Sequence, residues 1–362
     1  MSKKAMSKRL RDPNLLAAKT STDGLTWHDA LQAPCVLEGF PFRAANGPLF
    51  RLPQHIVPGL LPLLVHVAAQ PAGAGLRFAA TGDRLAVKVE LSRNETSRNC
   101  TYNATHGIDA YVDGPLGWTF VGNLAVEKPS TKWTAELRLP GTLAKALGDA
   151  PREWLLHLPL QNPVSGLKIG LEGAPQSPRA RNIAKPLVCY GSSITQGFCA
   201  SRPGLAWTNV VARALDVELV PLGFGGSARG EAEVAAAIAT IDASCVVIDY
   251  DHNAPDAAHL EHTHLPFLKI IRKARPRLPM VIATSPNFHG DAKYWGARRA
   301  VIRASFKAIG GPTRFVDGAT YHAAESWAET TIDRCHPNDL GFRQMADHIL
   351  PAIRSAMRAG RR

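Results

Sequence analysis

The chain has 362 residues, of which 45% are hydrophobic and 20% charged, a composition that excludes disorder across the whole chain. Because this length exceeds what one hydrophobic core usually serves, we expect two domains. The formal net charge is +12, but much of the excess lies at the two ends and no zinc-finger spacing accompanies it, so we expect a solvated basic tail over residues 1–23 and no nucleic-acid partner.

Residues 24–175 contain short β-like runs separated by Gly, Pro and Asn turn signals. Repeated short strands without long helical patterns are typical of a β-sandwich. The expected strands lie at 85–91, 110–112, 118–121, 133–139 and 167–171. The stretch GAPQSPRARNIAKP comes next, and it predicts a linker over residues 176–186.

From residue 187 to 362 the pattern changes to an apolar strand, a loop and a helix, repeated about five times. This alternation is typical of a parallel sheet wrapped by helices. The expected strands are 187–190, 218–222, 245–250, 280–284 and 314–316, and the expected helices are 207–215, 231–241, 265–274, 293–308 and 340–357. The sequence therefore predicts an α/β protein whose three-layer α/β/α domain follows a β-sandwich.

The cysteines and the amino terminus bear on location. The six cysteines are scattered and include no CxxC pair, which favours free thiols in a reducing compartment. No apolar stretch of signal-peptide length follows the basic amino terminus, and the most apolar run, 60–69, is too short to span a bilayer. We therefore predict a cytoplasmic protein with no membrane partner, in which the N-x-[ST] triplets at Asn94, Asn99 and Asn103 form an Asn/Thr-rich loop.

A serine-containing loop follows the first strand of the second region, with the sequence YGSSITQG from Tyr190 to Gly197. Open α/β sheets bind ligands at the carboxyl ends of their strands, and a helix that starts there offers amides to negative charge. A serine in this loop is well placed as a nucleophile, although Ser and Gly also cap helices.

A serine nucleophile needs a base, and the base needs a group that holds its tautomer. Near the carboxyl end the chain reads DRCHPND, with Asp333 three residues before His336. This spacing allows the carboxylate and the imidazole to share one loop. Asp339 could serve in place of Asp333, or His336 could be a surface residue before a helix capped by Asn338.

Two further strand ends offer donors for a developing oxyanion. The glycine-rich run 223–226 follows the second strand, and Asp251-His252-Asn253 follows the third. A glycine lets its amide approach a reacting centre, and an Asn side chain is a neutral donor. Each could also be a plain turn. All of these elements nevertheless lie at carboxyl ends of strands, on one edge of the predicted sheet.

Taken together, these motifs resemble a known family. GSSITQG resembles the GDSL-type motif, and with GFGG, the Asn of DYDHN and DRCHPND it is similar to the four ordered blocks of the SGNH hydrolases. The resemblance implies Ser193 as nucleophile, Gly226 and Asn253 as oxyanion donors together with the Ser193 amide, and His336 with Asp333 as base and orienting acid. Ser192 and Ala254 stand where the family often has Asp.

The amino-terminal half also carries a resemblance. The run GIDAY at 107–111 is similar to the GxDLY signature of the β-sandwich that precedes the hydrolase domain in one bacterial branch of the family, with Ala110 in place of Leu. The resemblance implies a serine esterase that works through an acyl-enzyme on a small-molecule or carbohydrate ester, deacetylation of a sugar being our first expectation. It implies no metal and no cofactor. A lipase or thioesterase of the same fold is the alternative.

Three other functions compete with this interpretation. Residues 223–228 also fit the dinucleotide fingerprint GxGxxA, with Asp242 about the right distance on. A metal could bind among clustered acidic and histidine side chains, namely Asp251, His252, His259, Glu261, His262 and His264, although their spacing fits no standard zinc site. A non-catalytic carbohydrate-binding protein is the third alternative, and retention of Ser, His and Asp argues against it.

Two expectations concern histidines. Since an imidazole must be neutral to accept a proton, the activity should fall on acidification if His336 is the base. Alternation along an extended segment should turn His252 away from the site that Asn253 faces.

Overall fold

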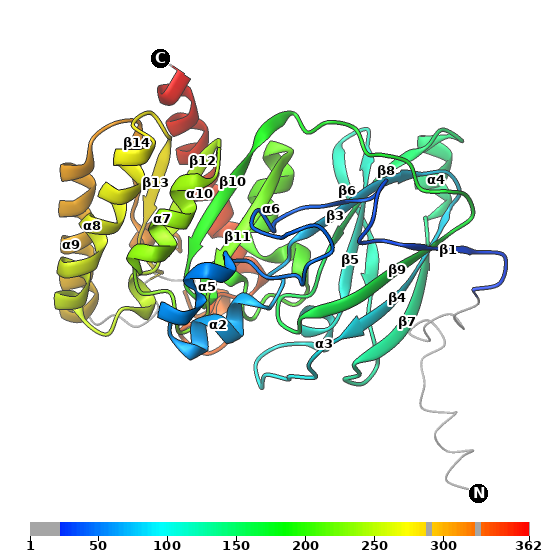
Figure 1. Cartoon of the computed structure of the whole chain (residues 1–362), viewed down its shortest axis with the longest axis horizontal. Coiled ribbons are helices and arrows are strands. Elements are labelled where there is room, and N and C mark those ends of the chain that lie inside the picture. The colour runs from blue at the N-terminus through cyan, green and yellow to red at the C-terminus, as the bar shows by residue number, and fades with distance from the viewer. Residues whose placement is uncertain (1–21, 287–291, 323–326, 362) are drawn as a thin grey trace, which may run out of the picture.

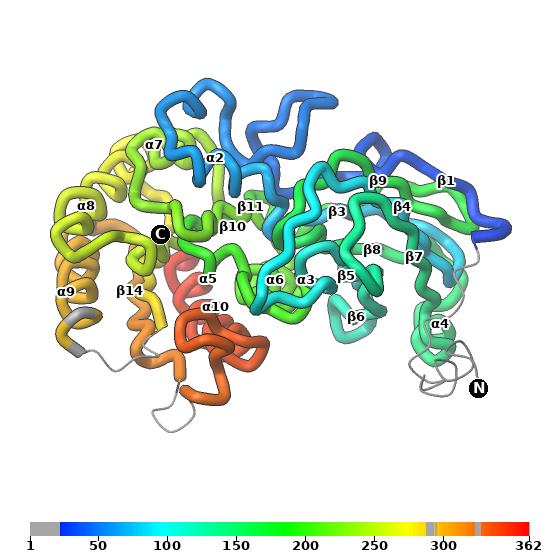
Figure 2. The backbone as a smooth tube through the Cα atoms, turned by 90° about the horizontal axis from the view of Figure 1, so that it is seen from below, coloured from blue at the N-terminus to red at the C-terminus, as the bar shows by residue number. Residues whose placement is uncertain are grey.

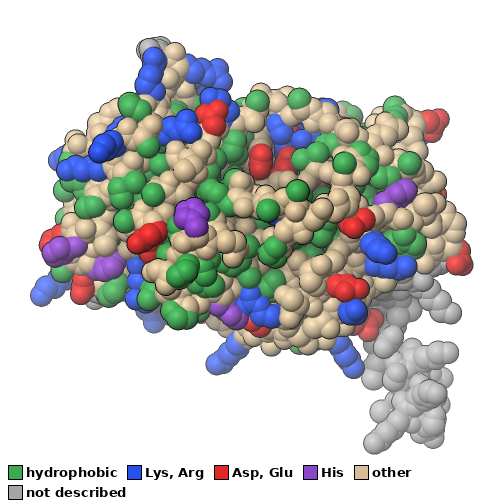
Figure 3. Space-filling model, in the orientation of Figure 1, with side chains coloured by type: hydrophobic (Ala, Val, Ile, Leu, Met, Phe, Trp, Pro, Cys, Tyr) green, Lys and Arg blue, Asp and Glu red, His purple; other side chains and the backbone are tan. Residues whose placement is uncertain are grey.

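The computed structural model describes residues 22–286, 292–322 and 327–361. A β-rich part and a helix-covered sheet lie side by side along the long axis (Figure 1). The expected basic tail, except for residues 22 and 23, lies outside the described residues. Lys and Arg side chains gather around the carboxyl end of the last helix on the face seen in Figure 3.

The amino-terminal part is a β-sandwich of two antiparallel sheets. One sheet has the order β1 (Thr26–Asp29), β9 (Val164–Leu171), β4 (Arg84–Leu91), β7 (Lys132–Arg138). The other has the order β2 (Val36–Leu37), β3 (Gly75–Ala80), β8 (Arg152–His157), β5 (Ile108–Gly114), β6 (Gly117–Leu124). The short helices α3 (Tyr102–Thr105) and α4 (Gly141–Leu147) lie in loops between strands. The predicted sandwich is confirmed.

Of the nine sandwich strands in the described residues, four were not expected from the sequence: β1, β2, β3 and β8. Strand β4 was expected, and in the structure Leu85, Val87 and Val89 are buried while Lys88 and Glu90 are exposed, which is the period of two for a strand with one buried face. In β3 all six residues are buried. Its side chains therefore do not alternate between a buried and an exposed face, and even the polar Arg77 is buried, beside Glu38 and Glu153.

The carboxyl-terminal part is a parallel sheet with helices on both faces. Its strand order is β11 (Val217–Gly223), β10 (Ile183–Gly191), β12 (Cys245–Asp249), β13 (Met280–Ala283), β14 (Thr313–Val316). Helices α6 (Trp207–Leu215) and α10 (Asp339–Arg361) pack on one face, and α7 (Ala232–Thr240), α8 (Ala257–Ala274) and α9 (Ala292–Ile309) on the other. The predicted α/β/α domain is confirmed. Strand β10 begins at Ile183, inside the segment expected as a linker.

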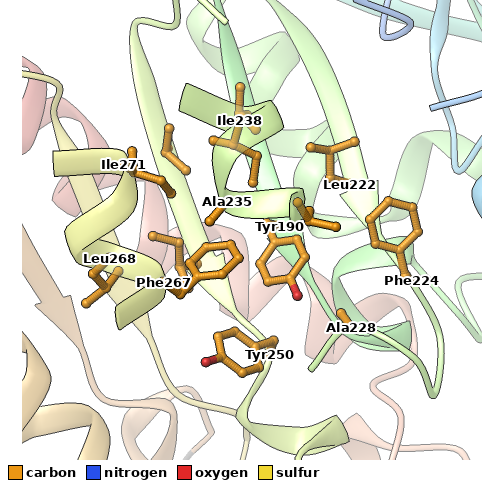
Figure 4. Close-up of a cluster of buried hydrophobic side chains, with 14 of the residues drawn as sticks. Tyr190, Leu222, Phe224, Ala228, Ala235, Ile238, Tyr250, Phe267, Leu268 and Ile271 are labelled. Carbon is orange, nitrogen blue, oxygen red and sulfur yellow. The ribbon is translucent and has the colours of Figure 1, made fainter. Parts of the chain in front are cut away.

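Successive side chains of β10 point to opposite faces of the sheet and join different core clusters. Val188 and Tyr190 join the core cluster on the side of α7 and α8, whereas Leu187 and Cys189 join the cluster on the side of α6 and α10. On the first side Tyr190 stacks on Phe267 at 4.7 Å between ring centroids, next to Tyr250 and Phe224 (Figure 4). Because both faces are buried, the strand ends emerge from a rigid support.

One segment of the amino-terminal half packs on the α/β domain, which the sequence did not indicate. It contains the 3-10 helix η1 (Gln54–Gly59) and the helix α2 (Pro62–Ala68), and it lies near α7 in Figure 2. Leu60, Leu64 and Val67 join the core cluster of that face. No helix in the described ranges is both long and apolar enough to cross a membrane. The cytoplasmic location stays a prediction.

Candidate active site

Ser193 lies at the first position of the short helix α5 (Ser193–Gln196), directly after β10. Ser192 is the helix N-cap, and its Oγ accepts a hydrogen bond from the Ile194 amide at 3.2 Å. Gly191 makes the tight turn possible, because a Cβ there would come within 2.2 Å of the Asp249 carbonyl oxygen. Ser192 therefore caps the helix, whereas Ser193 lies at the edge of the sheet.

The side chains of Ser193, His336 and Asp333 form an unbroken chain of hydrogen bonds. Ser193 Oγ lies 2.9 Å from His336 Nε2, and His336 Nδ1 lies 2.9 Å from Asp333 Oδ2. The segment of Asp333 and His336 precedes α10. Asp339, the alternative acid, instead accepts a hydrogen bond from the Ser201 amide at 2.8 Å. Of the two candidate acids, the structure brings Asp333 to the imidazole.

Asp333 is held as a carboxylate by its own loop. The amides of Cys335 and His336 donate to its Oδ1 at 3.0 and 2.8 Å. Burial acts to raise the pKa of Asp333, but the hydrogen bonds from the amide and side chain of His336 outweigh it and lower the pKa to about 2. An ionised Asp333 can accept the Nδ1–H of His336 and hold the tautomer in which Nε2 is free to accept a proton from Ser193.

The glycine-rich loop after β11 passes close to Ser193. A Cβ on Gly225 would lie 3.3 Å from the Ser193 Cβ, and the Gly225 amide donates to Gln196 Oε1 at 3.0 Å. Gly226 has φ +68°, a conformation that favours glycine. Within the described residues, the backbone N–H groups of Ser193 and Gly226 donate to no protein acceptor. Both amides are therefore open to a ligand.

Asn253 joins the loop after β12 to the same glycine-rich loop. Its Nδ2 donates to the Phe224 carbonyl oxygen at 2.9 Å. A side-chain amide has two N–H groups, so one of them is left for another acceptor. The sequence-predicted residues Ser193, Gly226, Asn253, Asp333 and His336 thus lie on elements that the structure brings together at one edge of the sheet.

The expectation for His252 was wrong. Residues Asp251–Asn253 form the 3-10 turn η3 rather than an extended segment, so the alternation of a strand does not apply. His252 Nε2 lies 3.0 Å from Cys335 Sγ, and its ring stacks on Trp295 with centroids 5.2 Å apart. His252 therefore packs against the loop that carries His336.

The histidines considered for a metal site have separate surroundings. His259 contacts the Arg229 carbonyl oxygen at 2.8 Å, His262 contacts the Ala258 carbonyl oxygen at 2.7 Å, and His264 is buried. In the described part of the chain, the one group whose possible ligand atoms lie within 4.8 Å of one another is Cys199, Asp333 and His336. Two of these three already belong to the hydrogen-bond chain of Ser193.

Two side chains that the sequence did not single out lie next to the hydrogen-bonded residues Ser193, His336 and Asp333. The Phe198 ring lies 4.7 Å from the His336 ring, between centroids. Leu63 of α2 is half exposed, and its Cδ2 would lie 3.5 Å from a Cβ on Gly226. Phe198 could have been noticed because it directly follows the GSSITQG motif. Leu63 carries no such signal, since it lies far from the other motifs in the sequence.

Comparison with known families matches both halves of the chain. Residues 184–354 match the GDSL-like lipase/acylhydrolase family. Residues 25–176 match a model described as the N-terminus of SGNH hydrolase-type esterases, named GxDLY. No curated protein matched the sequence.

Solved structures share the fold over almost the whole chain. A protein of Bacteroides ovatus described as a GDSL-like lipase is 24% identical, with a TM-score of 0.80 over 92% of this chain and 98% of its own. The salicylyl-acyltransferase SsfX3 from a tetracycline biosynthetic pathway is 18% identical, with 0.72 over 92% and 97%. A family two carbohydrate esterase from Cellvibrio japonicus is 13% identical, with 0.58 over 92% and 98%. The two family matches, together with the geometry above, show that this chain belongs to the GDSL-type SGNH hydrolases, in the branch with an amino-terminal GxDLY domain. It is a carboxylic ester hydrolase.

Proposed function

We propose that this chain is a serine esterase that works through an acyl-enzyme, with Ser193 as nucleophile, His336 as base and Asp333 as the acid that orients His336. The observation that carries the proposal is the chain of hydrogen bonds from Ser193 Oγ through His336 to Asp333, with 2.9 Å at each step. A base within hydrogen-bond reach of a hydroxyl, itself oriented by a third group, is the arrangement that activates a serine.

In the first half of the reaction, Ser193 Oγ attacks the ester carbonyl carbon while His336 Nε2 takes the hydroxyl proton. The amides of Ser193 and Gly226 and the free N–H of Asn253 stabilise the negative oxygen of the tetrahedral intermediate. The bond between the carbonyl carbon and the alcohol oxygen then breaks. His336 transfers its proton to that oxygen, so the alcohol leaves and the acyl group stays on Ser193.

In the second half, water takes the place of the alcohol. His336 accepts a proton from the water as it attacks the acyl carbon, and then returns that proton to Ser193 Oγ. The carboxylic acid leaves and the starting enzyme is restored. Besides the ester and water, this sequence of steps uses only side chains and amides of the chain.

For the substrate, we propose a small acyl group on a carbohydrate or a related polyol. Support comes from structures of the same fold that are named as carbohydrate esterases, including an acetyl xylan esterase, Est2A, from Butyrivibrio proteoclasticus with a TM-score of 0.56. The proposed site also has Phe198 against His336 on one side and Leu63 beside Gly226 on the other. These apolar side chains are suited to a compact acyl group rather than to a charged one.

The test is a fluorophosphonate probe combined with a panel of esters. The probe should label wild type and the control variant Ser192→Ala, and it should leave Ser193→Ala unlabelled. Ser193→Ala should also lose about 10⁴-fold or more in kcat. Labelling that persists in Ser193→Ala and disappears in Ser192→Ala would overturn the assignment. Among p-nitrophenyl esters and acetylated sugars, a preference for palmitate over acetate would favour the lipase alternative.

A further inference from the structure

A loop of the β-sandwich, residues 92–105 between β4 and β5, reaches the α/β domain next to the proposed active site. Thr101 Oγ1 donates to the Ser201 carbonyl oxygen at 2.5 Å, across the boundary between the two parts. The same loop carries the N-x-[ST] triplets that the sequence left without a function. Helix α3 at its end lies beside the α/β domain in Figures 1 and 2.

One of these asparagines contacts the proposed orienting acid. Asn99 Nδ2 donates to Asp333 Oδ2 at 2.9 Å, and this is the same oxygen that accepts His336 Nδ1. The other oxygen, Oδ1, accepts the amides of Cys335 and His336. A carboxylate has about four acceptor sites, so with Asn99 in place all four are occupied.

The loop is held in place by the sandwich. Asn162 Oδ1 accepts the Glu95 amide at 2.7 Å, and its Nδ2 donates to the Glu95 carbonyl oxygen at 3.0 Å. Gln161 accepts from Ser97 Oγ at 3.1 Å and donates to Cys100 Sγ at 3.4 Å. These contacts lie on both sides of Asn99. Its side chain is therefore presented to Asp333 by a supported loop.

We propose that Asn99 is a positioning residue, through which the sandwich domain sets the orientation of the Asp333 carboxylate toward His336. The inference rests on the proposed function of the Ser193–His336–Asp333 chain. Asp333 has a side chain that is 25% exposed, so water competes for its oxygens. With Asn99 bound, rotation of the carboxylate breaks a hydrogen bond to a fixed partner. Without Asn99, Oδ2 can turn toward solvent and the imidazole is oriented less well.

The first test is Asn99→Ala, assayed with p-nitrophenyl acetate. Because the loss acts on the orientation of the base, kcat should fall by about 10-fold, the lower end of the loss that follows removal of a group orienting a metal-bound histidine, while KM and the melting temperature stay unchanged. The matched control is Asn103→Ala in the same loop, whose exposed side chain forms no hydrogen bond with Asp333 or His336 in the described part of the chain. It should behave as wild type. Full kcat in Asn99→Ala would overturn the proposal.

A double-mutant comparison separates this role from a merely structural one. If Asn99 acts through Asp333, adding Asn99→Ala to Asp333→Ala should cause no further loss of kcat. A further loss of about 10-fold in the absence of Asp333 would contradict the proposal. Asn99→Asp, which has the same shape but places a carboxylate against Asp333, should be less active than Asn99→Ala, and activity equal to wild type would also contradict it.

The failure of this inference can be told apart from the failure of the proposed function. If Ser193→Ala and Asp333→Ala keep wild-type activity, the proposed function is wrong. If both lose activity while Asn99→Ala does not, only the positioning role is wrong.

Discussion

The two parts of the molecule contribute to the site in different ways. The α/β domain carries the groups proposed to act on the ester carbonyl, and they lie at the start of α5, in the segments after β11 and β12, and before α10. The sandwich half contributes contacts behind those groups, with Asn99 on Asp333 and Arg51 under the glycine-rich loop. Reacting groups and the groups that support them can therefore lie on separate domains. A mutation in one domain then tests one kind of group without altering the other.

A second contrast lies within the α/β domain, between two carboxylates near the Ser193 loop. Asp333 is partly exposed and hydrogen bonds lower its pKa to about 2. Burial, reinforced by the charge of Asp251, raises the pKa of Asp249 to about 8. Asp249 Oδ2 accepts the Thr195 hydroxyl at 3.0 Å, and its Oδ1 has no hydrogen-bond partner in the described part of the chain. Hydrogen bonds thus favour the charged form of the first carboxyl group, whereas burial favours the neutral form of the second.

Among the groups around Ser193 and His336, the largest effect should come from Asn253, which is proposed to touch the substrate. Asn253→Ala removes one oxyanion donor, which typically costs about 10²–10³-fold in kcat. KM should change far less, because the hydrogen bond strengthens as charge develops. Steady-state kinetics with p-nitrophenyl acetate measure both constants. His252 is unsuitable as a control since it packs on Cys335, so Asn103→Ala serves instead. An active Asn253→Ala would leave the Ser193 and Gly226 amides as the oxyanion donors.

An intermediate effect, on stability, is expected at Arg51, which joins the two halves. Its fully buried guanidinium donates to the carbonyl oxygens of Pro221, Gly223 and Val67 at 2.5, 2.7 and 2.7 Å. Arg51→Met removes these bonds and leaves the carbonyl groups without that donor. Since a hydrogen bond to a charged group contributes roughly 1.5–3 kcal/mol, the free energy of unfolding should fall by about 3 kcal/mol.

Urea unfolding followed by circular dichroism measures this change. Arg138→Met is the control, because Arg138 is exposed at the end of β7. If Arg51→Met unfolds at the same urea concentration as wild type, the contact between the amino-terminal segment and the end of β11 does not stabilise the protein.

The smallest effect should appear at Asp249. The unfolded chain ionises this group near ~3.9, whereas the folded protein keeps it protonated up to about 8. Between these values the folded state binds more protons, so the contribution of Asp249 to stability falls as the pH rises. Asp249→Asn should therefore raise the melting temperature at pH 8 and change it little near pH 4.

Thermal melts at a series of pH values test this expectation. The exposed Asp149→Asn should show no pH-dependent difference from wild type. A lower melting temperature for Asp249→Asn at pH 8 would mean that the charged form of Asp249 is stabilised in the folded protein.

The sequence by itself determined the elements of the α/β domain and the residues gathered at its edge. Apolar strands alternate with amphipathic helices, and this local pattern predicts a parallel sheet. Once the sheet is predicted, residues that follow its strands must lie close together, because the carboxyl ends of parallel strands meet at one edge. Ser193, Gly226 and Asn253 could be grouped on this basis, and His336 with Asp333 by their spacing.

Only the tertiary structure decided which side chains support that edge. Asn99 and Asp333 are 234 positions apart, and Arg51 and Gly223 are 172 positions apart. Neither pair leaves a periodic pattern in the sequence, since each depends on how one domain packs against the other. His252 was misjudged for a related reason, because a single 3-10 turn redirects a side chain without changing the local composition. Periodicity reports the buried face of an element, whereas contacts between elements depend on the packing of the whole chain.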